Sequence, residues 1–326
     1  MSIALDGKSL TIAKLVDVAR NNQTLEVTKE AWGRIKDCRK MLQKKIEAHE
    51  TMYGITTGIG EFSEVTLNPE QTEEFQKLLI YSHAAGIGDP MDIEIVRGAM
   101  CGRINVHAKG NSGGRSEITK YLLDSLNNKL TPVVCEKGSV GACGDLAPMS
   151  QIALAMMGEG EMFVEGKIID SKSALGIIGL KPLELEARDG LALINGSNVL
   201  TALAAIILYD SQRWMKMHDI AAAMTLEALK ANMKPYDKRI HKLRGFKGSQ
   251  KVAANLNILT EDSEILFSGG KKVQDAYSMR STPQVAGALR DSINFAVEQI
   301  EIELNGVGDN PIFLTEEAEV LTGANF

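Results

Sequence analysis

The chain has 326 residues, of which 44% are hydrophobic and 24% are charged, as is typical of a globular protein with one large or two interlocked domains. Its 36 Lys and Arg residues and 42 Asp and Glu residues give a formal net charge of −6, so it lacks the basic surface of a nucleic-acid-binding protein. The four cysteines form no Cys-x-x-Cys pair and no ligand spacing with the five histidines, and we therefore expect no metal site.

The N-terminal segment has the pattern of amphipathic helices. Apolar residues three and four positions apart predict helices over residues 10–20 and 29–49. Charged side chains from Asp6 to Asp17 interrupt the first segment, so it does not have the pattern of a signal peptide. We therefore expect a cytoplasmic protein with reduced thiols.

Glycine-rich loops follow these helices along the chain. Strand signals are few, and the best covers residues 164–170. Because loops rather than strands separate the helices, several of these loops can converge on one site. Their sequences are ITTGIGEF, HAAGIGDP, KGNSGGR, GSVGACGDLAP, INGS and SGGKK.

The second half of the chain predicts long helices. Residues 198–233 are rich in Ala, Leu and Met and contain no proline, which predicts a helix that is buried on most sides. Asp210 ends its most apolar run, so the segment is too short to cross a membrane. A second helix follows Pro283, carries one apolar stripe and ends at Gly306.

These patterns predict a mainly α fold with two parts. Residues 1–197 are expected to form an N-terminal domain that carries the glycine-rich active-site loops. Residues 198–326 are expected to form a bundle of long helices, which associates with other subunits.

The stretch GSVGACGDLAP, from Gly138 to Pro148, places one thiol among very small residues. Its simplest interpretation is a glycine-rich turn with a small buried Cys143. A reactive cysteine needs a neighbour that stabilises its thiolate, and the adjacent Asp145 would oppose this. Cys143 is therefore a poor candidate for an ordinary nucleophile.

Seven segments resemble, in order, motifs of the histidine and phenylalanine ammonia-lyase family. In that family an Ala-Ser-Gly tripeptide matures into a methylidene imidazolone, an electrophile made from the protein itself. The matching tripeptide here is Ala142-Cys143-Gly144, with cysteine in place of serine. The resembling segments are YGITTGIGEF, SHAAGIGDP, GSVGACGDLAP, LALINGS, VQDAYSMRSTPQ, GDNP and LTGANF.

The resemblance implies a protein-derived cofactor and no external one. The amide nitrogen of Gly144 would attack the carbonyl of Ala142, and loss of H₂O and H₂S would leave a methylidene group on the ring. Glycine presents the least steric hindrance to this geometry. Sulfur can leave as oxygen does, so Cys143 is compatible with the chemistry. Asp145 is the residue that the resemblance assigns to electrophile formation.

The resemblance also implies roles for residues elsewhere in the chain. Tyr53 would be the base that removes the β-proton, and Arg280 would bind the substrate carboxylate through two hydrogen bonds. A structural role stays open for Gln274. With the electrophile, Tyr53 and Tyr277 form the expected catalytic set, and the expected substrate-binding residues are His83, Asn195, Gln274, Arg280 and Phe326.

The Ser82-His83 pair resembles that of histidine lyases and favours histidine as the substrate, with urocanate and ammonia as products. A phenylalanine or tyrosine ammonia-lyase, or an aminomutase, is the alternative. Family members continue with further helices beyond the segment that matches Phe326. One subunit of a split lyase with a separate C-terminal partner, or a non-catalytic relative, therefore also stays open. We expect a homo-oligomer, a tetramer by resemblance, that acts on a small amino acid and binds no nucleic acid or membrane.

Overall fold

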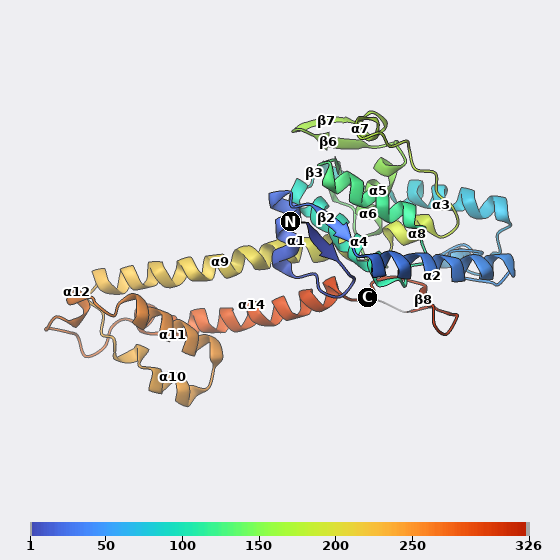
Figure 1. Cartoon of the computed structure of the whole chain (residues 1–326). Helices are drawn as coiled ribbons and strands as arrows, with labels where there is room; N and C mark the ends of the chain where they lie inside the picture. The colour runs from blue at the N-terminus through green and yellow to red at the C-terminus, as the bar shows by residue number, and fades with distance from the viewer. Residues whose placement is uncertain (1, 324–326) are drawn as a thin grey trace. The chain divides into compact units, whose positions relative to one another are not determined.

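A computed structural model describes residues 2–323 and confirms the mainly α fold (Figure 1). The chain forms two compact units. Unit 1 contains the residues up to Ile206 together with those from Ile300 onward, and unit 2 contains Ile207–Gln299. Residues 300–323 thus belong with the N-terminal part of the chain, whereas the sequence grouped them with the bundle. Their attachment has a local cause: Asp309 is buried and forms ion pairs with Arg103 and Arg188.

The helices of unit 1 begin at recognisable caps. The Thr11 and Thr28 side chains accept hydrogen bonds from backbone amides in the first turns of α1 and α2, and Asn68 forms a capping box with Gln71 at the start of α3. Helix α4 contacts α1, α2 and α5 and is buried on nearly all sides. The helices are α1 (Ile12–Asn21), α2 (Lys29–Glu47), the 3₁₀ turn η1 (Gly60–Phe62), α3 (Pro69–His83), α4 (Ile93–Lys109), α5 (Ser116–Asn127), α6 (Leu146–Met156), α7 (Ser171–Ile177) and α8 (Asp189–Ile194).

Short strands join the loops of unit 1. Strands β1 (Ile3–Leu5) and β2 (Leu25–Val27) pair in parallel, and β8 (Ile312–Leu314) and β9 (Glu319–Leu321) pair antiparallel. Strands β4 (Thr131–Pro132), β6 (Glu161–Val164) and β7 (Lys167–Asp170) form an antiparallel sheet. Strand β3 (Ile87–Pro90) pairs antiparallel with β5 (Cys135–Lys137), which places the segment after α3 beside the chain that enters GSVGACGDLAP.

The prediction of a single strand over residues 164–170 is wrong. Glu165 and Gly166 both have positive φ angles, of 49° and 78°, and they turn the chain between β6 and β7. Two successive positive φ angles are typical of a tight hairpin turn. The segment is therefore the end of a hairpin rather than one strand.

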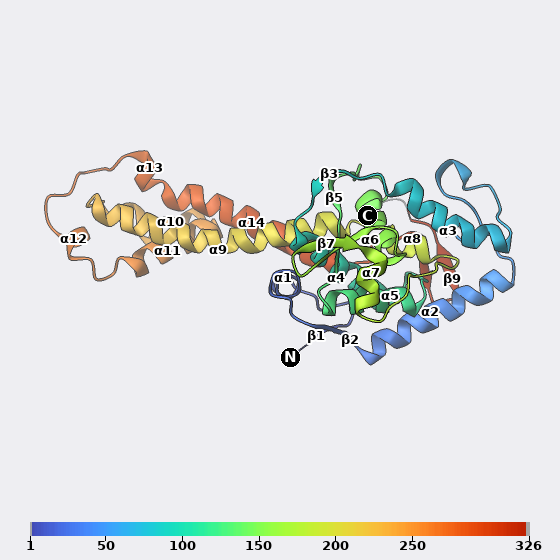
Figure 2. The same cartoon turned by 90° about the horizontal axis from the view of Figure 1, so that it is seen from above.

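Unit 2 is a helical bundle in which parts of α9 and α14 lie side by side (Figure 1, Figure 2). Helices α11 and α14 approach closely at Gly248 and Gly287, where a Cβ on Gly287 would lie 2.3 Å from the amide nitrogen of Ser249. The elements are α9 (Asn198–Ala228), which begins in unit 1, then η2 (Lys234–Tyr236), α10 (Lys238–Arg244), α11 (Lys247–Leu259), α12 (Glu264–Phe267), α13 (Tyr277–Arg280) and α14 (Thr282–Leu304), which ends in unit 1. Over residues 2–323, none of the helices has both the length and the apolar character that a bilayer span requires.

Candidate active site

The GSVGACGDLAP segment forms a tight turn between β5 and α6. Gly141 and Gly144 pair across it, and the amide of Gly144 donates to the Gly141 carbonyl at 3.3 Å. Cys143 and Gly144 both have left-handed backbones, with φ angles of 58° and 79°. The thiol of Cys143 is exposed, so the alternative of a small buried cysteine is wrong. An exposed residue whose backbone lies in an unfavourable region points to a functional turn.

Gly144 packs directly against the segment that carries Asn195. A Cβ on Gly144 would lie 2.4 Å from the carbonyl carbon and oxygen of Gly196, so only glycine fits at this position. Gly144 also pairs with Gly196, and the amide of Asp145 donates to the Gly196 carbonyl at 2.9 Å. The structure therefore brings together two of the predicted segments, the Ala-Cys-Gly turn and the residues after Asn195.

The carboxylate of Asp145 anchors this turn to the start of α9. The side chain is 5% exposed, and its two oxygens accept hydrogen bonds from the Ser139 hydroxyl and the Leu200 amide, both at 2.8 Å. A carboxylate at a helix N-terminus is stabilised by the free amides and the dipole of the helix. Asp145 is thus held on one side by its own loop and on the other by a long helix.

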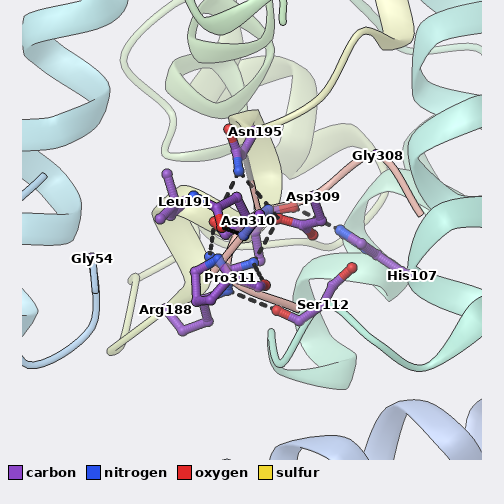
Figure 3. A network of polar contacts seen from close by, with 12 residues as sticks. Gly54, His107, Ser112, Arg188, Leu191, Asn195, Gly308, Asp309, Asn310 and Pro311 are labelled. Atoms are coloured by element: carbon purple, nitrogen blue, oxygen red, sulfur yellow. Dashed lines mark hydrogen bonds and ion pairs between the residues drawn. The ribbon is translucent and has the colours of Figure 1, made fainter. Parts of the chain in front are cut away.

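A buried ion cluster lies next to Asn195 (Figure 3). The Arg103 guanidinium from α4 contacts one carboxylate oxygen of Asp309 at 2.8 Å, and the Arg188 guanidinium contacts the other at 2.6 Å. None of the three side chains is exposed. Burial would raise the pKa of the Asp309 carboxyl, but the charges of Arg188 and Arg103 outweigh burial and lower it. Asp309 is therefore ionised, and the cluster holds two positive charges against one negative charge.

The cluster determines the position of Asn195. Arg103 donates to the backbone carbonyls of Ala192, at 2.7 Å from Nε, and of Asn195, at 2.7 Å from Nη1. The Asn195 side-chain amide donates to the Asn310 carbonyl at 2.9 Å and to Asp309 Oδ1 at 3.4 Å. Both the backbone and the side chain of Asn195 are thereby fixed by a cluster that is closed to solvent.

His107 lies in the same buried region and is neutral. Its ring nitrogens are 2.9 Å from the Thr119 hydroxyl and 2.8 Å from the Ala192 carbonyl. Burial, with a further contribution from the nearby positive charge of Arg103, lowers the pKa of His107 to about 3. The imidazole therefore serves as a hydrogen-bonding group and adds no third positive charge to the cluster.

This cluster was not predicted from the sequence. The segment that contains Asp309 resembled a family motif but received no role, and Arg103, Arg188 and His107 received none either. One available signal was Arg103 directly after the small and apolar run AMCG, since a charged residue in a buried helix requires a partner.

Tyr53 is half-buried in the loop before η1, and its hydroxyl accepts a hydrogen bond from the Gly60 amide at 3.3 Å. Gln76 attaches this loop to α8, because its amide donates to the Gly54 carbonyl at 3.5 Å and its oxygen accepts from the Leu191 amide at 3.3 Å. A Cβ on Gly54 would lie 2.6 Å from the Leu191 side chain. The tyrosine loop is therefore attached to the helix that leads into Asn195.

His83 is half-buried at the C-terminal end of α3. Its Nδ1 atom lies 2.9 Å from the Leu79 carbonyl and 2.9 Å from the Ser82 hydroxyl. Because a carbonyl can only accept, Nδ1 carries the proton in the neutral ring, and Nε2 is then an acceptor. The chain beyond His83 passes the base of the turn, where a Cβ on Gly138 would lie 3.1 Å from Gly86 Cα.

The remaining predicted residues lie in unit 2. Gln274 is exposed, and Tyr277 is 72% exposed. The Arg280 guanidinium carbon lies 3.7 Å from the centre of the Tyr277 ring, a cation–π contact, and its Nε is buried without a hydrogen-bond partner among residues 2–323. These residues belong to a different unit from Tyr53, His83 and Asn195, and their roles stay predictions. Phe326 lies outside the described residues.

A model of the aromatic amino acid lyase family matches residues 10–326 of the chain. The chain is 42% identical to the histidine ammonia-lyase of Alkaliphilus metalliredigens and 39% identical to that of Caldanaerobacter subterraneus, each over 325 residues that make up 99% of this chain and 64% of the relative. It therefore spans about 64% of the length of these relatives.

Solved structures share the fold. Histidine ammonia-lyase from Trypanosoma cruzi is 36% identical with a TM-score of 0.90, and the match covers 100% of this chain and 61% of that chain. Pantoea agglomerans phenylalanine aminomutase is 27% identical with a TM-score of 0.94, and the match covers 99% of this chain and 66% of that chain. The fold is thus similar to that of enzymes with different substrates.

Proposed function

Because the chain belongs to the aromatic amino acid lyase family, we propose that it eliminates ammonia from an aromatic L-amino acid, and that histidine is this substrate, with urocanate as product. The observation that carries the proposal is the turn at Cys143, which has an exposed thiol and a left-handed backbone at Gly141, Cys143 and Gly144. The reaction belongs in the cytoplasm, where thiols stay reduced.

The turn fits the methylidene imidazolone of the family. The backbone of Gly196 leaves no room for a Cβ on Gly144, whereas no atom lies within 4 Å of a Cβ built on Gly141. Ring closure joins the Gly144 nitrogen to the carbonyl carbon of Ala142, whose oxygen leaves as water with the two amide protons of Cys143 and Gly144. The Cys143 sulfur then leaves as H₂S with the Cα proton. The ring supplies an electrophilic carbon for the substrate amine.

The residues of this chain would perform the remaining steps. Tyr53, acting as a phenolate, takes the β-proton of the substrate and becomes a neutral phenol. Arg280 binds the substrate carboxylate through the parallel donors of its guanidinium. Support for this role of Arg280 is its buried Nε, which has no hydrogen-bond partner within residues 2–323. Asn195 and Tyr277 contribute polar contacts near the reacting carbon, and Gln274 contacts the substrate.

His83 favours an imidazole substrate. With its Nδ1 proton donated to the Leu79 carbonyl, the Nε2 atom can accept a hydrogen bond from a substrate N–H. A phenyl ring would leave this acceptor unpaired, which is unfavourable in a closed site. The relatives named histidine ammonia-lyase support the same choice.

We further propose a homo-oligomer, most simply a tetramer, with sites shared between copies. Support comes from large apolar side chains that are exposed along two long helices. Association of these faces would remove them from water and would allow residues of unit 2 to complete the site of another copy. On α9 they include Ile207, Trp214, Met217 and Met224, and on α14 they include Val285 and Phe295.

The test is an ultraviolet assay for α,β-unsaturated acids with histidine, phenylalanine and tyrosine. The chain is assayed alone and after mixing with the C-terminal third of a histidine ammonia-lyase relative. We expect turnover of histidine to exceed that of the other two substrates. His83→Leu should lower histidine turnover about 5- to 150-fold relative to phenylalanine turnover, the equivalent of about 1–3 kcal/mol for an unpaired buried group.

Arg280→Lys is the matched control for His83→Leu, because every substrate has the carboxylate. It should lower turnover of all three amino acids by a similar factor. Equal losses for all substrates in His83→Leu would remove the basis for histidine. Higher turnover of phenylalanine than of histidine by the unaltered chain would replace the proposal with a phenylalanine lyase or aminomutase.

A further inference from the structure

Arg103 directs its donors at two short segments, one that ends at Asn195 and one that contains Gly308 and Asp309. Its guanidinium donates to the carbonyls of Ala192 and Asn195 and to that of Gly308, the last at 3.2 Å, and it also contacts the Asp309 carboxylate. Arg188 holds the other oxygen of the same carboxylate. Arg103 thus holds the Asn195 carbonyl directly, Asp309 holds Arg103, and Arg188 acts on the Asn195–Gly196 peptide only through Asp309.

The opposite side of this peptide contacts the Ala-Cys-Gly turn. The Gly196 carbonyl accepts from the Asp145 amide at 2.9 Å, and Gly144 pairs with Gly196. Gly196 itself has no free space, because a Cβ there would lie 2.8 Å from the Gly308 oxygen and 3.0 Å from Arg103 Nη1. The Asn195–Gly196 peptide is therefore confined between the charged cluster and the turn.

We propose that Arg103, Arg188 and Asp309 are positioning residues that fix the Asn195–Gly196 peptide and so hold the Gly144 nitrogen where it can reach the Ala142 carbonyl. The cluster thereby sets the rate at which the turn closes into its ring. This inference rests on the proposed function, since it concerns formation of the electrophile that the function requires. The three residues touch neither the substrate nor the reacting atoms.

The geometry requires a guanidinium at position 103. Five donors in one plane serve three carbonyls and one carboxylate oxygen at once, whereas a lysine ammonium has three donors at a single point. Arg103→Lys keeps the positive charge beside Asp309 but leaves some of these carbonyls without a hydrogen-bond donor. A displacement of about 1 Å at a reacting group lowers rates by about 100-fold in comparable cases.

The experiment measures ring closure directly by mass. Chains are sampled at intervals after synthesis, and the peptide that contains residues 138–148 is scored for loss of one H₂O and one H₂S. Alkylation of Cys143 reports the fraction that has not closed. We expect Arg103→Lys to close at least about tenfold more slowly than the unaltered chain, although limited proteolysis shows it to be folded.

Arg97→Lys is the matched control, since Arg97 is a buried arginine on the same helix. Its guanidinium donates to the carbonyls of Ala19, Leu126 and Val18, at 3.2, 3.3 and 3.0 Å. These carbonyls belong to α1 and α5 and not to the segments that contact the turn. Arg97→Lys should therefore lose stability without slowing ring closure. Equal rates of closure in the folded Arg97→Lys and Arg103→Lys chains would overturn the inference.

A second variant, Asp309→Asn, tests the inference if Arg103→Lys does not fold. Asp309→Asn keeps the shape of the side chain and removes the charge that holds both arginines, and it should also slow closure. If Arg103→Lys does not fold, closure of Asp309→Asn at the unaltered rate overturns the inference. If the unaltered chain never loses H₂O and H₂S, the proposed function fails together with the inference. Normal closure in every folded variant removes the inference alone.

Discussion

Asp145 offers a test of how the turn is attached to the rest of unit 1. Asp145→Ala removes both acceptors at once, leaving the Leu200 amide and the Ser139 hydroxyl without their 2.8 Å partner. Loss of a helix cap costs about 0.5–2 kcal/mol, and a hydrogen bond to a charged group contributes about 1.5–3 kcal/mol. We expect Asp145→Ala to lower the free energy of unfolding of unit 1 by about 2–3 kcal/mol.

Asp145→Asn should cost much less. Its amide oxygen can accept from the Leu200 amide, and its NH₂ group can donate to the Ser139 hydroxyl oxygen. Only the negative charge at the N-terminus of α9 is lost, at a cost of about 0.3–1 kcal/mol. Asp170 provides the control, because it caps α7 from an exposed position through one hydrogen bond of 2.9 Å to the Ser173 amide. Asp170→Ala should cost about 1 kcal/mol.

The assay is urea unfolding followed by the fluorescence of Trp32, in a background in which Trp214 is replaced by Phe. The chain has two tryptophans, and Trp32 lies in unit 1, so the remaining signal reports the unit that contains Asp145. Asp145→Ala and Asp145→Asn with equal midpoints, or Asp145→Ala no worse than Asp170→Ala, would refute the assignment of Asp145 as a buried anchor.

Three further outcomes are expected. Gly287→Ala should cost at least about 1–3 kcal/mol in thermal or urea unfolding, because its Cβ would lie 2.3 Å from the Ser249 nitrogen. Gly33→Ala, in an open position of a helix, should instead gain about 0.5–1 kcal/mol, and a loss there would contradict the reasoning. The pKa of His107 falls from 6.5 to about 3 on folding, so its contribution to stability is present above about pH 6.5 and is lost as the pH falls toward 3. This loss should reach about 2 kcal/mol at pH 5 and should disappear in His107→Gln; an unchanged pH dependence in that variant would show that the proton binds elsewhere. Cys143→Ser should still close the ring but release a second H₂O in place of H₂S, so a sulfide assay that stays positive in this variant would show that the sulfur has another source.

Local sequence patterns predicted the local structure well. Helical periodicity located α1, α2, α9 and α14, because each buries at least one apolar face. The expectation that the helix from residue 198 is buried on most sides is wrong for the single chain, since Ile207, Trp214 and Met217 of α9 are exposed. The turn at residues 138–148 was predictable from its glycines, which allow the left-handed backbone found at Gly141 and Gly144. The hairpin at Glu165 and Gly166 was not, since only one of its two positive φ angles falls on a glycine.

Long-range partners were not predictable from the same patterns. Arg103 and Asp309 are 206 positions apart, and periodicity within one helix contains no information on such a pair. The same holds for Gln76, whose role depends on contacts with both Gly54 and Leu191. By resemblance the sequence indicated candidate residues for the chemistry, whereas the buried cluster of Arg103, Arg188 and Asp309 became visible only in three dimensions.

The interruption of unit 1 by unit 2 has a consequence for biosynthesis. The chain leaves unit 1 at Ile206 and returns at Ile300, so a ribosome makes Arg103 and Arg188 well before the carboxylate that pairs with them. Burying a guanidinium without its counter-ion is costly, and the nascent chain therefore keeps these arginines hydrated until Asp309 emerges. Only then does the Asn195–Gly196 peptide gain its support. On the proposed positioning role of the cluster, the support of the turn at Cys143 is complete only after the whole of the inserted bundle has been synthesised.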